Sequence, residues 1–463
     1  MIIAINARTL RSVPRDGIGW FTLEVVRGMV RNHPGHRFVM IGDRRYRQIA
    51  GNGDRYEERL AGTGQVQGDR LPGTGELQGD RLPGTGELLG DRLPGTGELL
   101  GDRLPGTGEL LGDRLPGTGE GNGIVLSEGN DSRKDRLPVY GSNIEYVTIP
   151  LRTVHPVLWH VWHEYLLPSV LKRIGADVFI APDGMIPLRT DVPCIPVIHD
   201  LNHEHRPGDI PRAESIYYRR RFPLFAGKGA RVATVSHFSA ADIAETYGVD
   251  PGKIDVVPNG VAENFSPPLA GEADETRRQY TGGRPYFLFV SNFSPRKNVE
   301  AVIRAFEQFR KAGHSDHVLL LAGRRLYLTR EMDRHLDASP YGSDILFTGS
   351  VTRDVLRRLY GAAEALTFVP WLEGFGIPVV EAQRCGTPCI LSDGSSLPEV
   401  SGGAALCVSP ADAGAIAEAM ARLVTDGALR RRLTAEGLAN SMRYTWEGAA
   451  DAMWKSVMKA TSR

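Results

Sequence analysis

The sequence predicts an α/β protein made of two Rossmann-like domains, each a doubly wound parallel sheet. The chain has 463 residues, which is too long for a single hydrophobic core. Short apolar runs such as residues 2–5 and 286–290 are each followed by a loop and an amphipathic helix, the order from which parallel sheets are built. Hydrophobic residues form 41% of the chain and charged residues 24%, as in soluble globular proteins.

Charge and cysteine content exclude several classes of protein. Lys and Arg total 55, as do Asp and Glu, so the neutral chain is not a general nucleic-acid binder. The four cysteines lie in apolar surroundings and form neither a disulfide framework nor a zinc pattern, which indicates a reducing compartment. We find no signal peptide and no run of about 18 apolar residues. The sequence therefore predicts a cytoplasmic protein.

Two segments divide the chain. Residues 267–284 are polar and contain Gly and Pro, and are predicted to link a first domain (1–266) to a second (285–443). Inside the first domain, the unit GDRLPGTGE starts at residues 68, 79, 90, 101 and 112, a period of eleven. Gly and Pro in each unit prevent a helix, and few apolar side chains are available for burial. We predict that residues 51–138 are a disordered low-complexity insert, although short repeats can also form a solenoid.

The segment WLEGFGIPVVE, residues 371–381, has the features of a nucleotide-sugar site. Gly374 and Gly376 allow the backbone to approach a ligand closely, and the helix that begins near Pro378 presents free amides that suit phosphate. Glu381, on that helix, can accept two hydroxyl hydrogens from a ribose, while Glu373 lies in the loop. The alternative is an ordinary turn followed by a helix with a solvated glutamate.

The residues EGFGIPVVEAQRCGTPCI resemble the Glu-x7-Glu signature of retaining GT-B glycosyltransferases of the family 4 or group 1 type. The resemblance extends over nearly all of the chain outside the repeats, and is greatest to bacterial polysaccharide mannosyltransferases. It implies a GT-B fold, in which the two domains face each other across a cleft. It also implies that the second domain binds the nucleotide sugar and that a final helix, residues 444–463, returns to the first domain.

A strand, a Gly-x-Gly turn and a helix occur in succession near the start of the chain, around Gly17 and Gly19. This order favours close contact between backbone and ligand, but the third glycine of a dinucleotide fingerprint is missing, so a simple tight turn is the alternative. The resemblance implies that both glycines face the donor phosphates and the acceptor.

The run VIHD places His199 and Asp200 at the carboxyl end of a strand, where open α/β sheets bind ligands. A lone histidine is more often structural, but the resemblance implies that His199 bonds to the transferred sugar or to the charge beside it. It also implies that Asp200 orients a loop or the acceptor. His203, Glu204 and His205 follow, but their spacing fits no set of metal ligands, so no metal site is predicted.

Seven cations lie between residues 206 and 231, with aromatic residues among them. Such a run is commonly a solvated helix face. Alternatively, it docks the first domain onto anionic lipid at the inner face of a membrane, beside a lipid-linked acceptor.

Arg296 and Lys297 stand between a buried strand and a helix start, where amides, helix dipole and two charges converge on a diphosphate. A solvated basic pair is the alternative. The resemblance implies that Lys297 binds the donor phosphate. Many relatives have an arginine two residues after the strand, where this chain has Asn292, so Arg296 is expected to supply the second charge.

Together these features predict a retaining hexosyltransferase that moves mannose from GDP-mannose to a hydroxyl of a glycan or lipid-linked acceptor, without any cofactor. The alternatives are a GT-B sugar-nucleotide epimerase and an inactive scaffold that binds nucleotide sugars. The expected catalytic residues are His199, Lys297 and Glu373. The expected substrate-binding residues are Gly17, Gly19, Asp200, Arg296, Gly374, Phe375, Gly376 and Glu381.

Overall fold

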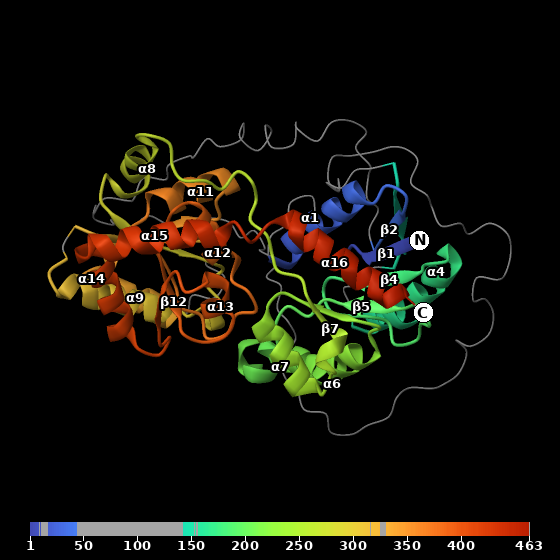
Figure 1. Ribbon diagram of the computed structural model, residues 1–463. Coiled ribbons are helices and arrows are strands. Elements are labelled where there is room, and N and C mark those ends of the chain that lie inside the picture. Colours follow the sequence, from blue (N-terminus) through green and yellow to red (C-terminus); the bar gives the residue numbers. More distant parts are fainter. Residues whose placement is uncertain are drawn as a thin grey trace, which may run out of the picture. The chain divides into compact units, whose positions relative to one another are not determined.

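A computed structural model describes residues 1–8, 10, 17–43, 142–151, 153, 156–314, 316–324 and 330–462 (Figure 1). These residues belong to one unit formed by Met1–Gly53 and Ile124–Arg463. The predicted repeat insert, 51–138, lies outside the described residues.

The first sheet has five parallel strands in the spatial order β3-β2-β1-β4-β5. Its central strand β1 pairs Ile3 with Phe38 on one side and with Val178 on the other. The central strands are almost wholly apolar and buried, because helices cover both faces of such a sheet. The strands are β1 (Ile2–Asn6), β2 (Arg37–Gly42), β3 (Ile144–Thr148), β4 (Val178–Ala181) and β5 (Cys194–Pro196).

A short parallel pair, β6 (Val232–Thr234) and β7 (Ile254–Val256), continues this sheet through a bridge between Val197 and Ala233. The strand that was expected to lead directly to His199 ends as β5 at Pro196, and Val197 forms only a single bridge, to Ala233.

The second sheet has six parallel strands in the order β10-β9-β8-β11-β12-β13. The chain begins at the centre of the sheet, builds outward in one direction and then returns to build in the other, as in a doubly wound fold. The strands are β8 (Tyr286–Val290), β9 (Val318–Ala322), β10 (Ile345–Gly349), β11 (Ala365–Phe368), β12 (Cys389–Ser392) and β13 (Leu406–Val408). Two doubly wound parallel sheets confirm the predicted α/β fold class.

Helices alternate with the strands. Those that precede β8 are α1 (Gly17–Asn32), α3 (Pro156–Val161), the π-helical turn η1 (Trp162–Leu166), α4 (Leu167–Ile174), α5 (Asn202–His205), η2 (Pro207–Asp209), α6 (Arg212–Lys228), α7 (His237–Tyr247), η3 (Pro251–Lys253) and α8 (Glu272–Thr281). Those that follow it are η4 (Pro295–Lys297), α9 (Val299–Lys311), α10 (Arg330–Ala338), η5 (Gly342–Asp344), α11 (Arg353–Ala362), α12 (Ile377–Arg384), α13 (Leu397–Ser401), α14 (Ala413–Thr425), α15 (Gly427–Ser441) and α16 (Trp446–Thr461).

The aromatic run before Pro168 favours a helix that ends near that proline, but the helical segment continues past it. Proline interrupts a regular α-helix because it lacks an N–H donor. Here the π-helical turn η1 precedes it, the amide of Leu167 bonds to the carbonyl of Trp162, and Pro168 lies in the first turn of α4. The helical segment thus continues to Ile174.

The segment predicted as a linker, 267–284, is helical from Glu272 to Thr281. This helix, α8, is attached to the neighbouring chain by side chains, because Arg357 pairs with Glu272 and Arg277 bonds to the carbonyl of Ala362. The flanking Pro and Gly residues resemble those of a flexible connection, but they only delimit the helix. The other domain limits stay predictions.

The last helix, α16, lies along α1 in Figure 1. A Cβ atom added at Gly28 of α1 would lie only 2.4 Å from Cβ of Ala450, so glycine allows the two helices to touch. Asp255 of β7 anchors α16 by polar contacts: its carboxylate accepts from Arg231 at 2.7 and 2.8 Å, from Ser456 Oγ at 2.8 Å and from Lys459 Nζ at 2.6 Å.

No helix among the described residues is long and apolar enough to cross a bilayer.

We predict that Asp255→Ala lowers the free energy of unfolding by about 2–4 kcal/mol, because it removes a largely buried acceptor and leaves Arg231 without its partner. The urea unfolding transition, followed by tryptophan fluorescence, measures the change. Asp451→Ala, which removes an exposed carboxylate on α16, is the control, and its effect should stay within about 0.5 kcal/mol. Equal effects of the two substitutions would contradict the anchoring role.

Candidate functional site

Two loops meet where the order of the second sheet reverses, between β8 and β11. Ligands bind at this point in open α/β sheets, because the loops on either side diverge and leave a crevice at the carboxyl ends of the strands. The loop after β8 contains η4 and hence Arg296 and Lys297. The loop after β11 contains Glu373. The structure therefore brings together three of the residues that the sequence singled out.

Asn298 fixes the first loop against the second. Its φ of 58° lies in the left-handed region, which asparagine tolerates better than most residues. Its side-chain amide donates to the carbonyls of Val369 at 3.0 Å and Pro410 at 2.8 Å. The amide of Trp371 also bonds to the carbonyl of Arg296 at 2.9 Å. The basic pair is thus held rigidly beside the end of β11.

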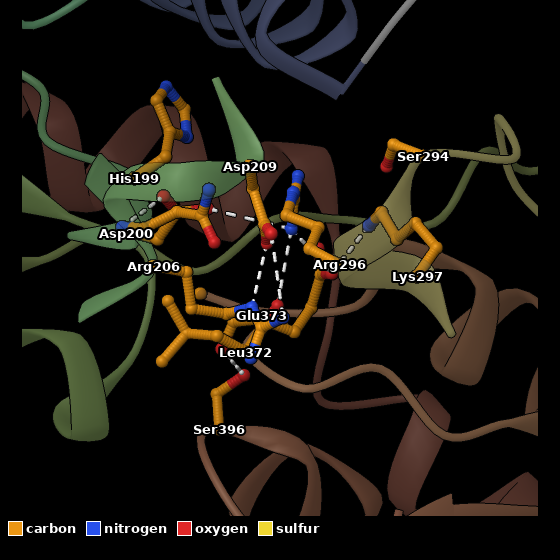
Figure 2. Close-up of polar contacts among 12 residues, drawn as sticks. His199, Asp200, Arg206, Asp209, Ser294, Arg296, Lys297, Leu372, Glu373 and Ser396 are labelled. Atoms are coloured by element: carbon orange, nitrogen blue, oxygen red, sulfur yellow. Dashed lines mark hydrogen bonds and ion pairs between the residues drawn. The ribbon is translucent and has the colours of Figure 1, made fainter. Parts of the chain in front are cut away.

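Glu373 is the acceptor for both cations (Figure 2). Its Oε2 atom lies 2.5 Å from Nζ of Lys297 and 3.0 Å from Nη1 of Arg296. The same Arg296 nitrogen lies 3.2 Å from the carbonyl of Leu372 and 3.9 Å from Oδ2 of Asp200. Ser396 Oγ donates to the backbone carbonyl of Glu373 at 2.8 Å and so holds the loop in place.

The cluster of Asp200, Arg296, Lys297 and Glu373 balances two positive charges with two negative ones in a largely buried place. Burial and the charge of Arg296 lower the pKa of Lys297. Burial acts against the charge of Arg296 too, but Glu373 and Asp200 outweigh it and raise the pKa of the guanidinium. Burial would raise the pKa of Asp200, yet the charge of Arg296 brings it below its usual range. Each charge depends on its neighbours for stability.

Gly374 touches the backbone of His199. A Cβ atom at residue 374 would lie 1.9 Å from the carbonyl oxygen of His199, so only glycine fits. Ser236, the N-cap of α7, donates to the carbonyl of Gly374 at 2.7 Å. Ser239 Oγ lies 3.3 Å from the carbonyl oxygen of Gly374 and 3.3 Å from that of His199. The loop after β11 is therefore held against the segment after β5. A close backbone contact and the hydroxyls of Ser236 and Ser239 hold them together.

Gly376 caps α12 with a φ of 88°, and Ile377 and Pro378 form the first turn, as the sequence predicted. Phe375 was expected to bind substrate through this turn, and its side chain lies elsewhere. Its ring is buried and packs edge-on against Tyr444, with 5.4 Å between ring centroids. The ring serves the hydrophobic core, so only the backbone of Phe375 is left to contact a substrate.

Glu381 has no contact with the charge cluster. It is buried on α12, where its Oε2 accepts from the hydroxyl of Tyr360 at 3.1 Å. Burial raises the pKa of Glu381 to about 7, against the opposing charge of Arg353 and the bond from Tyr360. Arg353 also lies 3.2 Å from the ring centroid of Trp20 and 3.5 Å from Glu24 Oε1, both on α1.

Gly17 and Gly19 form the first turn of α1 and not a loop before it. A Cβ atom at Gly17 would lie 3.5 Å from Cδ1 of Ile377, the first residue of α12. Gly19 is buried. The start of α1 and the start of α12 therefore lie close together.

His199 contributes its backbone to the site, but its ring points away from Glu373 in Figure 2. Nε2 lies 3.0 Å from the carbonyl of Pro182, and because a carbonyl only accepts, the proton is on Nε2. Phe21 of α1 contacts the ring edge-on at 5.1 Å. The structure does not bring the imidazole to the basic pair.

The neighbouring histidines have partners of their own. His203 Nε2 lies 2.9 Å from the hydroxyl of Tyr247, and His205 Nε2 lies 2.7 Å from Asp242 Oδ1. In the described part of the chain, no three His, Cys, Asp or Glu side chains converge as metal ligands would.

Several residues of the site were missed by the sequence analysis: Asn298, Ser236 and Ser239, Ser396, Tyr360 and Arg353. A serine before a helix, such as Ser236, suits a helix cap, but that position gives no sign that its hydroxyl also donates to a distant carbonyl. The sequence contains a weak indication for Asn298, because asparagine directly before a helix tolerates the left-handed conformation.

Two family models match the chain. The model described as "Glycosyltransferase Family 4" matches residues 124–265, and the one described as "Glycosyl transferases group 1" matches residues 272–439. The second match contains the loop of Lys297 and the loop of Glu373.

Relatives of known function are similar over more than half of the chain. The O-antigen chain mannosyltransferase B of Escherichia coli is 26% identical over 271 residues, which are 58% of this chain and 71% of that protein. The serotype-specific mannosyltransferase WbdA of Escherichia coli is 29% identical over 275 residues, but these cover only 33% of WbdA.

Among solved structures, sucrose-phosphate synthase from Thermosynechococcus elongatus aligns over 99% of this chain and 98% of its own, with a TM-score of 0.64 and 15% sequence identity. That likeness concerns the fold. The two family models show that the chain belongs to the family 4 and group 1 glycosyltransferases, and the structural likeness shows that it has the GT-B fold.

Proposed function

We propose that this protein transfers mannose from GDP-mannose to a hydroxyl of a glycan or lipid-linked acceptor, with retention of anomeric configuration. The choice of mannose is supported by the relatives named as mannosyltransferases, and the choice of a nucleoside diphosphate by the charge cluster. No cofactor takes part in the proposed reaction.

The observation that carries the proposal is the convergence of Lys297 and Arg296 on one carboxylate oxygen of Glu373. Two fixed cations aimed at a single oxygen form an anion site, and here an internal carboxylate occupies it. A diphosphate offers more oxygens and more charge than a carboxylate, so it competes well for the same donors.

The difficult step is the departure of the diphosphate, because positive charge develops on the sugar as the bond from C1 to the phosphate oxygen breaks. Lys297 and Arg296 stabilise the leaving diphosphate, an effect of a few kcal/mol for each well-placed donor. The acceptor oxygen forms a new bond to C1 on the same face, and its proton passes to the leaving diphosphate. Retention follows without a covalent enzyme intermediate.

Glu373 exchanges partners in this scheme. While the site holds no donor, Glu373 neutralises the basic pair. When the diphosphate binds those cations, the carboxylate is released toward the sugar and its developing charge. Glu381 lies on the next turns of the same segment and accepts the ribose hydroxyls, which its carboxylate form does best.

Epimerisation and the role of an inactive scaffold that binds nucleotide sugars are less well supported. The relatives that match this chain are named as transferases, and the charged residues that a transfer reaction needs are present and paired. His199 would have to use an atom other than Nε2, or turn its ring, to reach the sugar.

We predict that the purified protein consumes GDP-mannose in preference to UDP-glucose and forms an α-mannosyl product. Coupled detection of GDP and nuclear magnetic resonance of the product measure this.

Lys297→Ala should lower kcat/KM by about a hundredfold to a thousandfold, because one donor to the leaving group is lost. Lys311→Ala, an exposed lysine at the end of α9, is the matched control. Full transfer activity in Lys297→Ala would refute the proposal.

We predict that Glu373→Gln binds GDP about tenfold more tightly than the wild type but transfers mannose more slowly. The substitution removes the internal competitor for Lys297, and it also removes the charge that the reaction requires. Isothermal titration with GDP alone separates binding from catalysis. Glu300→Gln, whose partner is the exposed Arg304, should change neither quantity. Weaker GDP binding by Glu373→Gln would contradict the exchange of partners.

We predict that GDP affinity rises as the pH rises through about 7. Burial raises the pKa of Glu381 to about 7, so below that pH the carboxyl is mostly protonated and accepts ribose hydroxyls poorly. Titration calorimetry between about pH 6 and about pH 8 measures the effect. In Glu381→Gln the GDP phosphates still titrate, but the additional pH dependence of GDP affinity that comes from the Glu381 carboxyl should be lost. An identical pH profile in the two proteins would exclude the ribose contact.

A further inference from the structure

Helix α6 carries an exposed stripe in which cations and apolar residues alternate at every fourth position. Arg212, Ile216, Arg220, Leu224 and Lys228 are all exposed, and Ile216 and Leu224 retain 45% and 50% of their accessible surface. Residues four apart lie on one side of a helix. The opposite side of α6 is buried through Ser215, Phe222 and Phe225.

A second exposed stripe runs along α3, η1 and α4. Leu158, Val161, Tyr165 and Leu166 are between 36% and 46% exposed, at the spacing of one helix face. Lys172 and Arg173 follow at the end of α4 and are exposed as well. This stripe is apolar in its first half and cationic in its second.

The two stripes lie on neighbouring helices. Trp159 contacts Tyr217 edge-on at 5.5 Å, and each is adjacent in sequence to a member of a stripe, Leu158 and Ile216. Below that contact, Arg221 of α6 pairs with the buried Glu164 of η1. Ten large hydrophobic side chains are exposed among the described residues, and six of them belong to these two stripes. Such a concentration is not expected of a surface that faces only water.

The charge of this surface is strongly one-sided. Within residues 158–174 and 212–228, six Lys and Arg side chains are exposed, whereas Glu214 is the only exposed carboxylate. The whole chain, in contrast, is neutral. Cations that surround exposed aliphatic and aromatic side chains are the combination that binds a bilayer interface, where the apolar groups enter the acyl boundary and the cations meet anionic headgroups.

We propose that the surface formed by the exposed stripes of α3–η1–α4 and α6 docks on a membrane that contains anionic lipid. Nucleic acid would engage the cations but gain nothing from Ile216 and Leu224. A protein partner would not require the strong excess of positive charge. This inference rests on the surface itself and stands independently of the transfer reaction.

Sedimentation of the full-length protein with vesicles tests the proposal. We expect binding to vesicles of phosphatidylcholine and phosphatidylglycerol, and little binding to phosphatidylcholine alone. The triple variant Arg212→Gln, Arg220→Gln, Lys228→Gln should lower the partition coefficient about a hundredfold. The pair Ile216→Ser and Leu224→Ser should lower it at least about tenfold, because two side chains can no longer enter the interface.

A matched control replaces three exposed arginines elsewhere, Arg422, Arg431 and Arg443, with glutamine, and should bind as the wild type does. All variants change exposed side chains, and thermal unfolding by circular dichroism verifies that each is folded. The proposal is wrong if the wild type does not sediment with anionic vesicles, or if the control loses as much binding as the α6 triple variant. It is also wrong if the triple variant loses binding while the Ser pair does not, since that result indicates a purely electrostatic partner such as nucleic acid.

Discussion

One carboxylate oxygen, Oε2 of Glu373, holds the loops that follow β8 and β11 in register. Two cations adjacent in sequence and largely buried repel each other and lose hydration, so they are stable there only beside negative charge. Glu373 supplies most of that charge and Asp200 supplies the rest. A site built in this way is poised to receive an anion, because an incoming diphosphate replaces one negative group with another and leaves no cation uncompensated.

The rigidity around this pair comes from contacts that side chains and a glycine make with main-chain carbonyls. Gly374 lies against the carbonyl of His199, and the hydroxyl of Ser236 bonds to the carbonyl of Gly374 while it caps α7. On the other side, Asn298 adopts a left-handed conformation and bonds to the end of β11. Strand ends, helix caps and side-chain donors thus satisfy one another's hydrogen bonds, and the charged side chains are set on a fixed frame.

The sequence predicted those features that depend on local pattern. Residues 286–290 form a strand with the expected limits, because an uninterrupted apolar run before a loop has few other conformations in a parallel sheet. Residues 389–392 were not predicted as a strand, since their run of four is short and lies close to a helix end. The continuation of the helix past Pro168 depends on a π-helical turn, which no sequence pattern indicates.

For the site, the sequence indicated the chemical types at the strand ends but not their pairing. Lys297 and Glu373 are 76 positions apart, and only the tertiary fold makes them neighbours. The direction of the His199 ring and the burial of the Phe375 ring depend on Pro182 and Tyr444, which lie far away in the chain. The orientation of a side chain that can face either a ligand or the core is therefore set by tertiary contacts that the local sequence does not contain.

The position of α16 has a consequence for biosynthesis. Translation produces this helix after every other described element, yet it covers α1 and donates two hydrogen bonds to Asp255 of β7. The first half of the chain therefore leaves the ribosome with the α1 face beside Gly28 uncovered and with Asp255 bonded to Arg231 but lacking its donors Ser456 and Lys459. Co-translational folding of that half remains incomplete until the second half has been made, and a chaperone that shields this α1 face during this interval would limit aggregation.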